Sequence, residues 1–404
     1  MIYLDHAATT PVFPGALEAA WPWLTGDFGN PSSTYELGAR AAGALTDARR
    51  SIANWLGVSS HDVVFTSGGT EGNNLCVVGL ALANPRGKHI ISARTEHEAV
   101  LASIDYLQRM HDFEVTWLPV DRSGAIEVSA LEAALRPDTT LVTLMTANNE
   151  NGLVHPVAEF ARMAHSVGAL LHTDAVQAAN WLDVSPTRAE SHAYGVDALT
   201  ISGHKLGSPK GSGAVYLRSG LAIEPTLHGG GQEGDRRSGT ENVAWAVALA
   251  TAIEHAVPRD DALQAEATRV SQMGADFIDA VLATVPEAAL VGPAVVRPTP
   301  GLALDATVRI PSIASFVFEG LNGETLLLEL EQRGIIVSSG AACAAGKDEP
   351  SHVLRACGFA DDVARTQVRF SFAHTTSKED LESTVDAIAA AATSVRNLGA
   401  SPHA

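Results

Sequence analysis

Apolar and polar positions along this chain alternate in a way that predicts strands and helices in turn. Apolar runs of β-type residues lie at 63–66, 89–92, 114–118, 141–146, 170–172, 198–201 and 213–217. Helical spacing of apolar residues fills most of the intervals, as in residues 71–83, where Leu75, Val78 and Leu82 share one face. This alternation is typical of a mainly parallel sheet that is covered by helices on both faces. We therefore predict an α/β fold.

The last third of the chain has a different organisation. A helical region runs from about residue 242 to residue 285 and is broken near Pro258. Beyond it, the pattern predicts strands at 315–319, 335–337 and 368–371 and helices at 324–333 and 378–395. Since 404 residues are too many for one simple core, we predict two domains with their boundary in this helical region.

Composition narrows the classes of function. With 27 Lys and Arg against 46 Asp and Glu, the formal net charge of −19 disfavours nucleic acid and anionic membranes as partners. The first residues lack a cationic region followed by an apolar run, and no apolar stretch is long enough to span a bilayer. The three cysteines, Cys76, Cys343 and Cys357, are a sparse and odd set that fits free thiols better than disulfides. We expect a cytoplasmic protein.

Polar clusters follow four of the predicted strands. They are Thr95-Glu96-His97, Asn148-Asn149-Glu150-Asn151-Gly152, Thr173-Asp174-Ala175-Val176-Gln177 and Ser202-Gly203-His204-Lys205. Taken singly, His97 could be a surface histidine, Asn149 a turn residue and Asp174 a helix cap. Because ligands of parallel α/β sheets bind at the carboxyl ends of the strands, four clusters at four strand exits predict a binding site there.

Lys205 is the most informative residue of these clusters. It lies in a tight polar loop, residues 202–211, between two apolar β-type segments. A lysine that is held near other cations or partly desolvated loses its proton more readily and can form a Schiff base with an aldehyde cofactor. An isolated lysine in a glycine-rich loop is usually only a solvated residue. The neighbouring clusters favour the catalytic interpretation.

Two glycine-rich segments are suited to bind a phosphate group. Residues 67–70, Ser-Gly-Gly-Thr, turn from a strand into a helix, whose first N–H groups and positive dipole end attract anions. Residues 228–240 combine glycines with arginines and hydroxyl groups. Either signal is weak when taken alone, because many such turns bind nothing.

One of the cysteines lies in a segment of small residues. Residues 338–347 surround Cys343 with Ser, Gly and Ala, so this segment can be mobile and nothing bulky hinders access to the sulfur. The alternative is a small-residue loop with an incidental cysteine. Cys76 and Cys357 lie beside apolar neighbours in predicted helices, and we expect both to be buried packing residues.

Taken together, the motifs resemble those of the pyridoxal-phosphate-dependent cysteine desulfurases of the iron–sulfur assembly and nitrogen-fixation type, in the class V aminotransferase family. The resemblance covers almost the whole chain, from Tyr3-Leu-Asp to beyond Arg369-Phe-Ser. Its motifs are Gly29-Asn-Pro-Ser-Ser, Ser67-Gly-Gly-Thr-Glu, Thr95-Glu-His, Asn148-Asn-Glu, Asp174-Ala-Val-Gln, Ser202-Gly-His-Lys, His228-Gly-Gly-Gly-Gln-Glu, Arg237-Ser-Gly-Thr, Ser339-Gly-Ala-Ala-Cys, Glu349-Pro-Ser-His-Val-Leu and Arg369-Phe-Ser.

The resemblance implies a role for each site residue. Lys205 would hold the cofactor as a Schiff base and then act as the base at the substrate Cα, and Cys343 would take the substrate's sulfur as a persulfide. His97 would stack on the cofactor ring and assist proton transfers. The other implied cofactor contacts are Gly69, Thr70, Asp174 at the pyridine nitrogen, Gln177, Ser202, His204, and Thr240 from the neighbouring subunit. The implied ligands of the substrate carboxylate are Asn30, Asn149 and Arg369, and no metal ligand is implied.

The resemblance also implies the architecture, which is the aminotransferase-like fold of fold-type I pyridoxal-phosphate-dependent transferases. A large cofactor domain would span residues 15–257, and a smaller α+β domain would combine residues 1–14 with 258–404 and carry the mobile cysteine loop, 338–347. The enzyme would be a homodimer with its active sites at the subunit interface. It would convert L-cysteine to L-alanine and pass the sulfur to an acceptor protein, such as an iron–sulfur scaffold or a thiolation protein.

Other functions remain open. A selenocysteine lyase, or another lyase or transaminase of the same fold, would share most of these residues, and the accessible Cys343 argues against transamination but not against selenocysteine. An alternative from another class of function is a sulfur-relay docking scaffold with residual activity. The chain also departs from the family pattern at Tyr35, where histidine is common, and at Asn73, where an acidic residue is common.

Overall fold

The computed structural model describes residues 1–84, 86–255, 257, 260–295, 297, 308–340 and 349–400. Cys343 therefore lies outside the described residues, as does most of the predicted loop 338–347. Part of the segment between residues 292 and 311 lies outside them as well. None of the helices in the described ranges reaches the length and apolar character that a membrane crossing requires.

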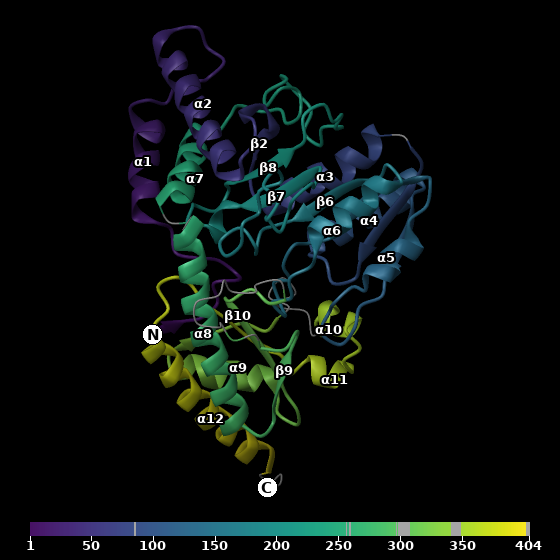
Figure 1. Cartoon of the computed structure of the whole chain (residues 1–404). Coiled ribbons are helices and arrows are strands. Elements are labelled where there is room, and N and C mark those ends of the chain that lie inside the picture. Colours follow the sequence, from purple (N-terminus) through teal and green to yellow (C-terminus); the bar gives the residue numbers. More distant parts are fainter. Residues whose placement is uncertain are drawn as a thin grey trace.

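A large sheet forms the centre of the first part of the chain (Figure 1). In the described residues its seven strands are, in sheet order, β2 (Val63–Thr66), β8 (Gly213–Leu217), β7 (Ala198–Ser202), β6 (Leu170–Asp174), β5 (Thr139–Thr143), β3 (His89–Ala93) and β4 (Glu114–Leu118). Strand β8 runs antiparallel to both of its neighbours, and the strand pairs from β7 through to β4 are parallel. The predicted mainly parallel sheet is therefore confirmed.

Helices cover both faces of this larger sheet, because its strands are apolar on both sides. Ile90 and Leu141 pack with α3 (Gly69–Ala83) and α4 (Glu98–His111), whereas the adjacent Ile91 and Val142 pack on the opposite face. Successive side chains of a strand point to opposite faces, so a continuously apolar strand needs cover on both. The core on the second face includes α2 (Glu36–Leu56), α5 (Val128–Ala134) and α6 (Val157–Ser166). The remaining helices of this part are α1 (Pro14–Thr25) and α7 (Val243–His255), which pack on each other.

A smaller antiparallel sheet organises the C-terminal part. Its strands in the described chain are, in order, β12 (Val368–Ser371), β10 (Ile313–Phe318) and β9 (Ala288–Val291). The helices around it are α8 (Asp260–Thr284), α9 (Gly323–Gln332), α10 (His352–Ala356), α11 (Asp361–Ala364) and α12 (Lys378–Ala400) (Figure 1). Edge-to-face contacts of Phe277 with Phe370 and Phe316, at centroid distances of 5.3 and 6.2 Å, fill its core. Helix α7 ends at His255 and α8 begins at Asp260, on either side of the predicted break near Pro258, which lies outside the described residues; the exact domain division stays a prediction.

The N-terminal arm ties these two parts together. Strand β1 (Ile2–Tyr3) pairs in parallel with β11 (Ile335–Ile336), which the sequence pattern had not indicated for the arm. The Leu4 carbonyl then accepts a hydrogen bond from the Ser371 amide of β12 at 2.7 Å. A few residues later, the Thr10 amide donates to the His204 carbonyl after β7 at 3.0 Å. The arm thus passes from the smaller sheet to the edge of the larger one.

Candidate active site

The four predicted polar clusters lie together at the carboxyl edge of the larger sheet. Asp174 and Ser202 are the last residues of β6 and β7, and hydrogen bonds join the loops that follow the neighbouring strands. The Met145 amide donates to Glu96 Oε1 at 2.8 Å, and Asn148 Nδ2 donates to the Thr95 carbonyl at 2.9 Å. Since β3, β5, β6 and β7 are parallel, their exits meet on one edge, as the sequence predicted.

The glycine turn before α3 forms a cradle beside Ser202. Gly68, the residue before this helix, has a φ of 147°, a conformation that side chains with a Cβ rarely adopt. A Cβ on Gly69 would lie 3.0 Å from Val176 Cγ2 and 3.4 Å from Ser202 Cβ, so the backbone approaches β7 closely there. Gly69 and Thr70 are the first residues of α3, and the N–H groups of such a helix N-terminus are suited to bind an anion.

Asp174 is held by two donors in a buried position. Its Oδ2 accepts a hydrogen bond from Asn73 Nδ2 at 2.6 Å, and its Oδ1 accepts from the Val176 amide at 2.9 Å. Asn73 Oδ1 is buried and has no hydrogen-bond partner within the described part of the chain. At this position, where the family commonly has an acidic residue, Asn73 donates a hydrogen bond to Asp174. An acidic residue would instead place a second negative charge against Asp174.

Lys205 ends the short 3-10 helix η2 (Gly203–Lys205) and points to the N-terminal arm. Its Nζ donates to the Ala8 carbonyl at 2.5 Å and also to the Ala7 carbonyl. The Ala7 carbonyl accepts a further hydrogen bond from Gln177 Nε2 at 3.1 Å. The structure thus brings the two predicted cofactor ligands Lys205 and Gln177 to the same short stretch of backbone.

His204 is half-buried between this lysine and the arm. Its Nδ1 lies 3.1 Å from Thr9 Oγ1, in a hydrogen bond. Burial, together with the positive charges of Lys205 and Lys210, lowers the pKa of His204 to about 4. The imidazole is therefore neutral near pH 7, and in the tautomer whose Nδ1 accepts from the Thr9 hydroxyl, the Nε2–H can donate to a phosphate.

His97 is the residue before α4, and its ring caps that helix. Its Nδ1 accepts a hydrogen bond from the Ala99 amide at 3.0 Å, so the proton of the neutral ring sits on Nε2. The preceding Glu96 is fully buried, and burial raises the pKa of its carboxyl well above its usual range. Glu96 therefore fixes the position of His97 through its bond to Met145 without adding a full negative charge beside Asp174.

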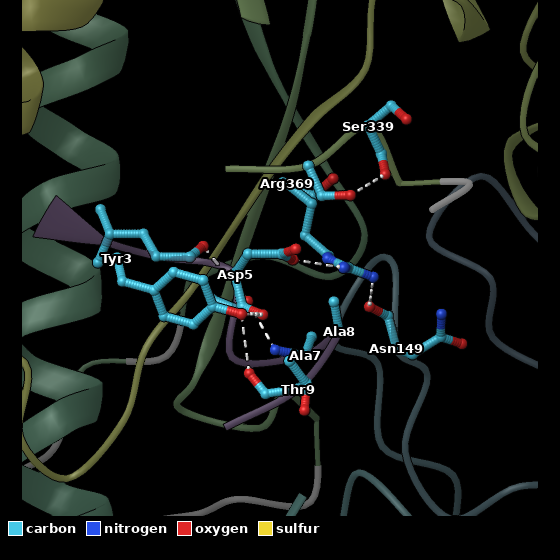
Figure 2. A network of polar contacts seen from close by, with 12 residues as sticks. Tyr3, Asp5, Ala7, Ala8, Thr9, Asn149, Ser339 and Arg369 are labelled. Carbon is cyan, nitrogen blue, oxygen red and sulfur yellow. Dashed lines mark hydrogen bonds and ion pairs between the residues drawn. The ribbon is translucent and has the colours of Figure 1, made fainter. Parts of the chain in front are cut away.

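Arg369 on β12 lies between Asp5 and Asn149 (Figure 2). Its Nη2 donates to Asp5 Oδ1 and its Nη1 donates to the Asn149 carbonyl, each at 2.9 Å. The side chain is only 2% exposed, although a guanidinium is seldom buried without a counter-charge. The contact joins the N-terminal arm, the smaller sheet and the loop after β5 at one point. Sequence reasoning missed Asp5, for which the Tyr3-Leu-Asp motif was the available signal.

The chain re-enters the described residues at Glu349 and docks on the same loops. Ser351 Oγ donates to Glu150 Oε2 at 2.5 Å, and Ser351 also caps α10 by accepting from the Leu354 amide. His352 Nε2 lies 2.9 Å from the Glu96 carbonyl, in a hydrogen bond. The motif after the predicted cysteine loop therefore contacts the residues beside His97 and Asn149, a role that sequence reasoning had not assigned to it.

The two described cysteines are buried, as predicted. Cys76 is fully buried in α3, where its sulfur accepts a hydrogen bond from Thr200 Oγ1 at 3.8 Å. Cys357 is 4% exposed at the end of α10. Burial raises the pKa of each thiol to about 12, so neither forms the thiolate that attack on sulfur requires.

Three predicted site residues are not brought to this place by the described chain. Asn30 lies in the exposed turn between α1 and α2, where its Oδ1 accepts from the Ser32 amide at 2.9 Å. Thr240 is exposed after the second glycine-rich segment and takes part in none of the hydrogen bonds above. Cys343 lies outside the described residues. The roles of these three residues stay predictions.

The fold and this arrangement define a class of protein. A family model described as aminotransferase class-V matches residues 2–383, and the chain belongs to that family. Within it, the chain is 40% identical to the cysteine desulfurase IscS of Dictyoglomus turgidum over 96% of this chain and 93% of that protein. It is 38% identical to an IscS-like cysteine desulfurase of Mycobacterium tuberculosis, over 98% of this chain and 97% of the relative. The sequence-based resemblance to cysteine desulfurases is confirmed.

Solved structures agree with this placement. A NifS-like protein superposes with a TM-score of 0.83 at 32% identity, covering 96% of this chain and 98% of that protein. SspA in complex with cysteine superposes with a TM-score of 0.76, also at 32% identity, covering 92% of this chain and 99% of SspA. The prediction of an aminotransferase-like, fold-type I architecture is thereby confirmed.

Proposed function

We propose that this chain acts on L-cysteine as a pyridoxal-phosphate-dependent desulfurase that leaves L-alanine and a persulfide on Cys343. One observation carries the proposal: the arm residues 5–8 contact Arg369 at one end and Lys205 at the other. The first and last Cα atoms of such a stretch are at most about 11 Å apart. An amino acid whose carboxylate binds Arg369 can therefore direct its amino end towards Lys205.

The residues at the sheet edge fit pyridoxal phosphate. At the cradle of Gly68 and Gly69, a Cβ on Gly69 would lie in tight contact with Val176 Cγ2 at 3.0 Å, and the N-terminus of α3 offers N–H groups, as a phosphate requires. We infer that Gly69, Thr70, Ser202 and His204 hold the phosphate, Asp174 the pyridine nitrogen, Gln177 the phenolic oxygen and Lys205 the aldehyde carbon. When bound, pyridoxal phosphate supplies an electron sink for the bonds at the substrate Cα.

Each of the remaining steps belongs to side chains of this chain. Arg369 binds the substrate carboxylate and, with Asn149, fixes the orientation of its Cα. Lys205 takes the proton from the substrate Cα. The buried carboxylate of Asp174 would keep the pyridine nitrogen protonated. His97, whose Nδ1 accepts a hydrogen bond from the Ala99 amide, assists the proton transfers.

The sulfur transfer balances without a further reactant. The Cys343 thiolate attacks the substrate sulfur, so an S–S bond forms as the Cβ–S bond breaks. The electron pair of the broken bond stays with the carbon atom, which takes up a proton to become the methyl group of alanine. The product pair is L-alanine and a persulfide on Cys343, from which an acceptor protein, such as an iron–sulfur scaffold or a thiolation protein, takes the sulfur.

We also infer that the working form is a homodimer. Thr240 is exposed and would contact the phosphate of the neighbouring subunit, as the family resemblance implies. Leu17, Trp21 and Leu24 of α1 are 46%, 65% and 51% exposed, and their spacing puts them on one face of the helix. An apolar row of this kind is typical of a surface that a second subunit covers.

The test is persulfide formation by purified protein that has been loaded with pyridoxal phosphate. With L-cysteine and a reductant, alanine and sulfide should appear in equal amounts, and without reductant the protein should gain the mass of one sulfur atom on Cys343. Cys343→Ala should still bind the cofactor but form neither product. Cys76→Ala and Cys357→Ala are the matched controls, and their turnover should stay within about twofold of the original, since both thiols are buried.

Persulfide mass on the Cys343→Ala protein at the original rate would exclude this residue as the sulfur acceptor. A comparable loss of turnover in either control would contradict the division of roles among the three cysteines. Alanine formation without any gain of sulfur mass would instead favour a lyase that releases sulfide directly.

A further inference from the structure

Asp5 carries a carboxylate from the N-terminal arm to the buried guanidinium of Arg369. The two side chains are 16% and 2% exposed, and their hydrogen bond is 2.9 Å long. Charge-assisted hydrogen bonds of this kind are shorter and stronger than neutral ones, and they fix orientation when solvent is excluded. Asp5 therefore does more than neutralise a charge, because it determines where one edge of the guanidinium points.

The guanidinium of Arg369 retains donors for a further partner. A guanidinium has five N–H groups, and the two bonds to Asp5 and Asn149 use one on each terminal nitrogen. Arg369 Nε is buried and has no hydrogen-bond partner in the described ranges. A buried donor without an acceptor is costly, which indicates that an acceptor binds here when the protein is active. A carboxylate is the acceptor that matches a guanidinium edge.

The turn that presents Asp5 is itself held at both ends. Tyr3 Oη lies 2.9 Å from the Thr9 carbonyl and 3.1 Å from the Asp5 carbonyl, so its hydroxyl closes the turn (Figure 2). The Ala7 amide donates to Ser371 Oγ at 2.8 Å, two residues beyond Arg369 on β12. The carboxylate and the guanidinium are thus fixed to the same strand, and neither can shift without breaking these bonds.

We propose that Asp5 is a positioning residue for the amino-acid carboxylate, which it serves by holding Arg369 with its remaining N–H groups towards the substrate. The inference rests on the proposed function, in which Arg369 binds that carboxylate. Tyr3 supports Asp5 in this role, since its hydroxyl fixes the turn that presents Asp5. The ion pair also keeps the Arg369 charge compensated when no amino acid is bound, as a buried cation requires.

The experiment measures substrate affinity apart from turnover. In cofactor-loaded protein, Asp5→Ala should raise KM for L-cysteine by about 10- to 100-fold, the factor that one charge-assisted hydrogen bond carries, with kcat changed less than about threefold. Asp5→Asn should show a smaller rise, because its amide oxygen still accepts from Nη2. Tyr3→Phe removes only the hydroxyl and should raise KM by about 3- to 10-fold.

L-Alanine provides a readout that does not depend on desulfuration. It carries the same carboxylate and amine, and its binding can be followed through the absorbance of the cofactor. Asp5→Ala should weaken L-alanine binding by the same factor as it raises KM. If the original protein binds L-alanine but releases no sulfur from L-cysteine, the proposed function fails, while the alanine titration still decides the role of Asp5.

Glu287→Gln is the matched control, since Glu287 pairs with Arg396 at 2.7 Å, is 22% exposed and lies away from the site. It should leave KM and L-alanine binding unchanged, and any loss of thermal stability in it calibrates the cost of removing such an ion pair. KM and L-alanine affinity within about twofold of the original in Asp5→Ala, or a loss of kcat alone with a matching loss of stability, would overturn the inference. Should Asp5→Ala fail to fold, unchanged KM in both Asp5→Asn and Tyr3→Phe would overturn it as well.

Discussion

Two halves of the candidate active site are built in different ways. The cofactor half consists of residues at the exits of neighbouring strands, such as Asp174 on β6 and Ser202 on β7, and the ladder of one sheet sets their spacing. The substrate half depends on the contact between Asp5 and Arg369, which lie 364 residues apart in the chain. One half thus follows from the register of a sheet, and the other from a few polar side chains that the fold brings together.

This difference predicts two kinds of failure. A substitution in the cofactor half leaves the sheet in place and removes a ligand of the cofactor. It should therefore weaken cofactor binding or lower kcat. A substitution in the substrate half alters how the amino-acid carboxylate is held, so its main effect should be a higher KM. The predictions below, from the largest effect to the smallest, test whether the halves separate in this way.

The largest effect is expected from Lys205→Ala. Without its amine the protein cannot hold the cofactor covalently or take a proton from the substrate Cα, so turnover should be abolished and the visible band of the bound cofactor lost. Lys210→Ala is the matched control, because Lys210 lies exposed in the same loop. Absorbance spectra and alanine formation measure both. Normal turnover in Lys205→Ala would show that Lys205 neither holds the cofactor nor acts as the base.

Asp174→Ala should have the next largest effect. It removes the buried carboxylate that is proposed to pair with the pyridine nitrogen, and an unpaired buried charge typically costs enough to lower kcat by about two orders of magnitude or more. KM should change little, in contrast to Asp5→Ala. Stopped-flow measurement of the proton abstraction step and steady-state alanine formation give the two parameters.

Asp197→Asn controls for the loss of a buried carboxylate from the same sheet. Asp197 lies just before β7, at the opposite end from the site, and pairs with Arg218 and His165 at 2.6 and 2.8 Å. Its replacement should lower stability while the cofactor stays bound and kcat is retained. If Asp174→Ala instead raised KM with kcat intact, the distinction between the two halves would not hold.

The cofactor half could largely be predicted from the sequence, and the reason is local. Apolar runs in the sequence located β6 and β7, and the polar residues that end these strands, Asp174 and Ser202, follow directly in the chain. Parallel strands then bring those ends together without further information. The glycine turn before α3 was recognisable for the same reason, although its approach to Ser202 needed the structure.

The substrate half could not be predicted in this way. No local pattern indicates that a residue at position 5 meets one on a strand near the C-terminus, since that contact depends on how β1 pairs with β11. The same holds for Ser351 and Glu150, whose hydrogen bond joins segments 201 residues apart. Motif resemblance pointed to Arg369 but not to the carboxylate that holds it. Long-range polar pairs of this kind carry no periodicity that a sequence pattern could show.

The smallest effect concerns the strands that carry the cofactor half, and how the stability of the protein changes in acid. His172 on β6 lies two residues before Asp174 and is fully buried between Thr143 Oγ1 and Thr200 Oγ1, at 2.9 and 3.1 Å from its ring nitrogens. Burial lowers its pKa from 6.5 to about 3. Between these two values the unfolded chain binds a proton that the folded chain does not.

The stability that His172 contributes by staying neutral is therefore complete above pH 6.5 and is lost as the pH falls towards about 3. The free energy of unfolding should fall with pH by up to about 1.4 kcal/mol per pH unit from this residue. His172→Gln keeps a neutral polar group but has no proton to gain, so its urea midpoint should fall less between about pH 7 and pH 5 than that of the original. His61→Gln, at an exposed histidine, should run parallel to the original protein. If the urea midpoint of His172→Gln also changed with pH in parallel with that of the original protein, the buried His172 would not determine the loss of stability in acid. Other titratable groups would then determine it.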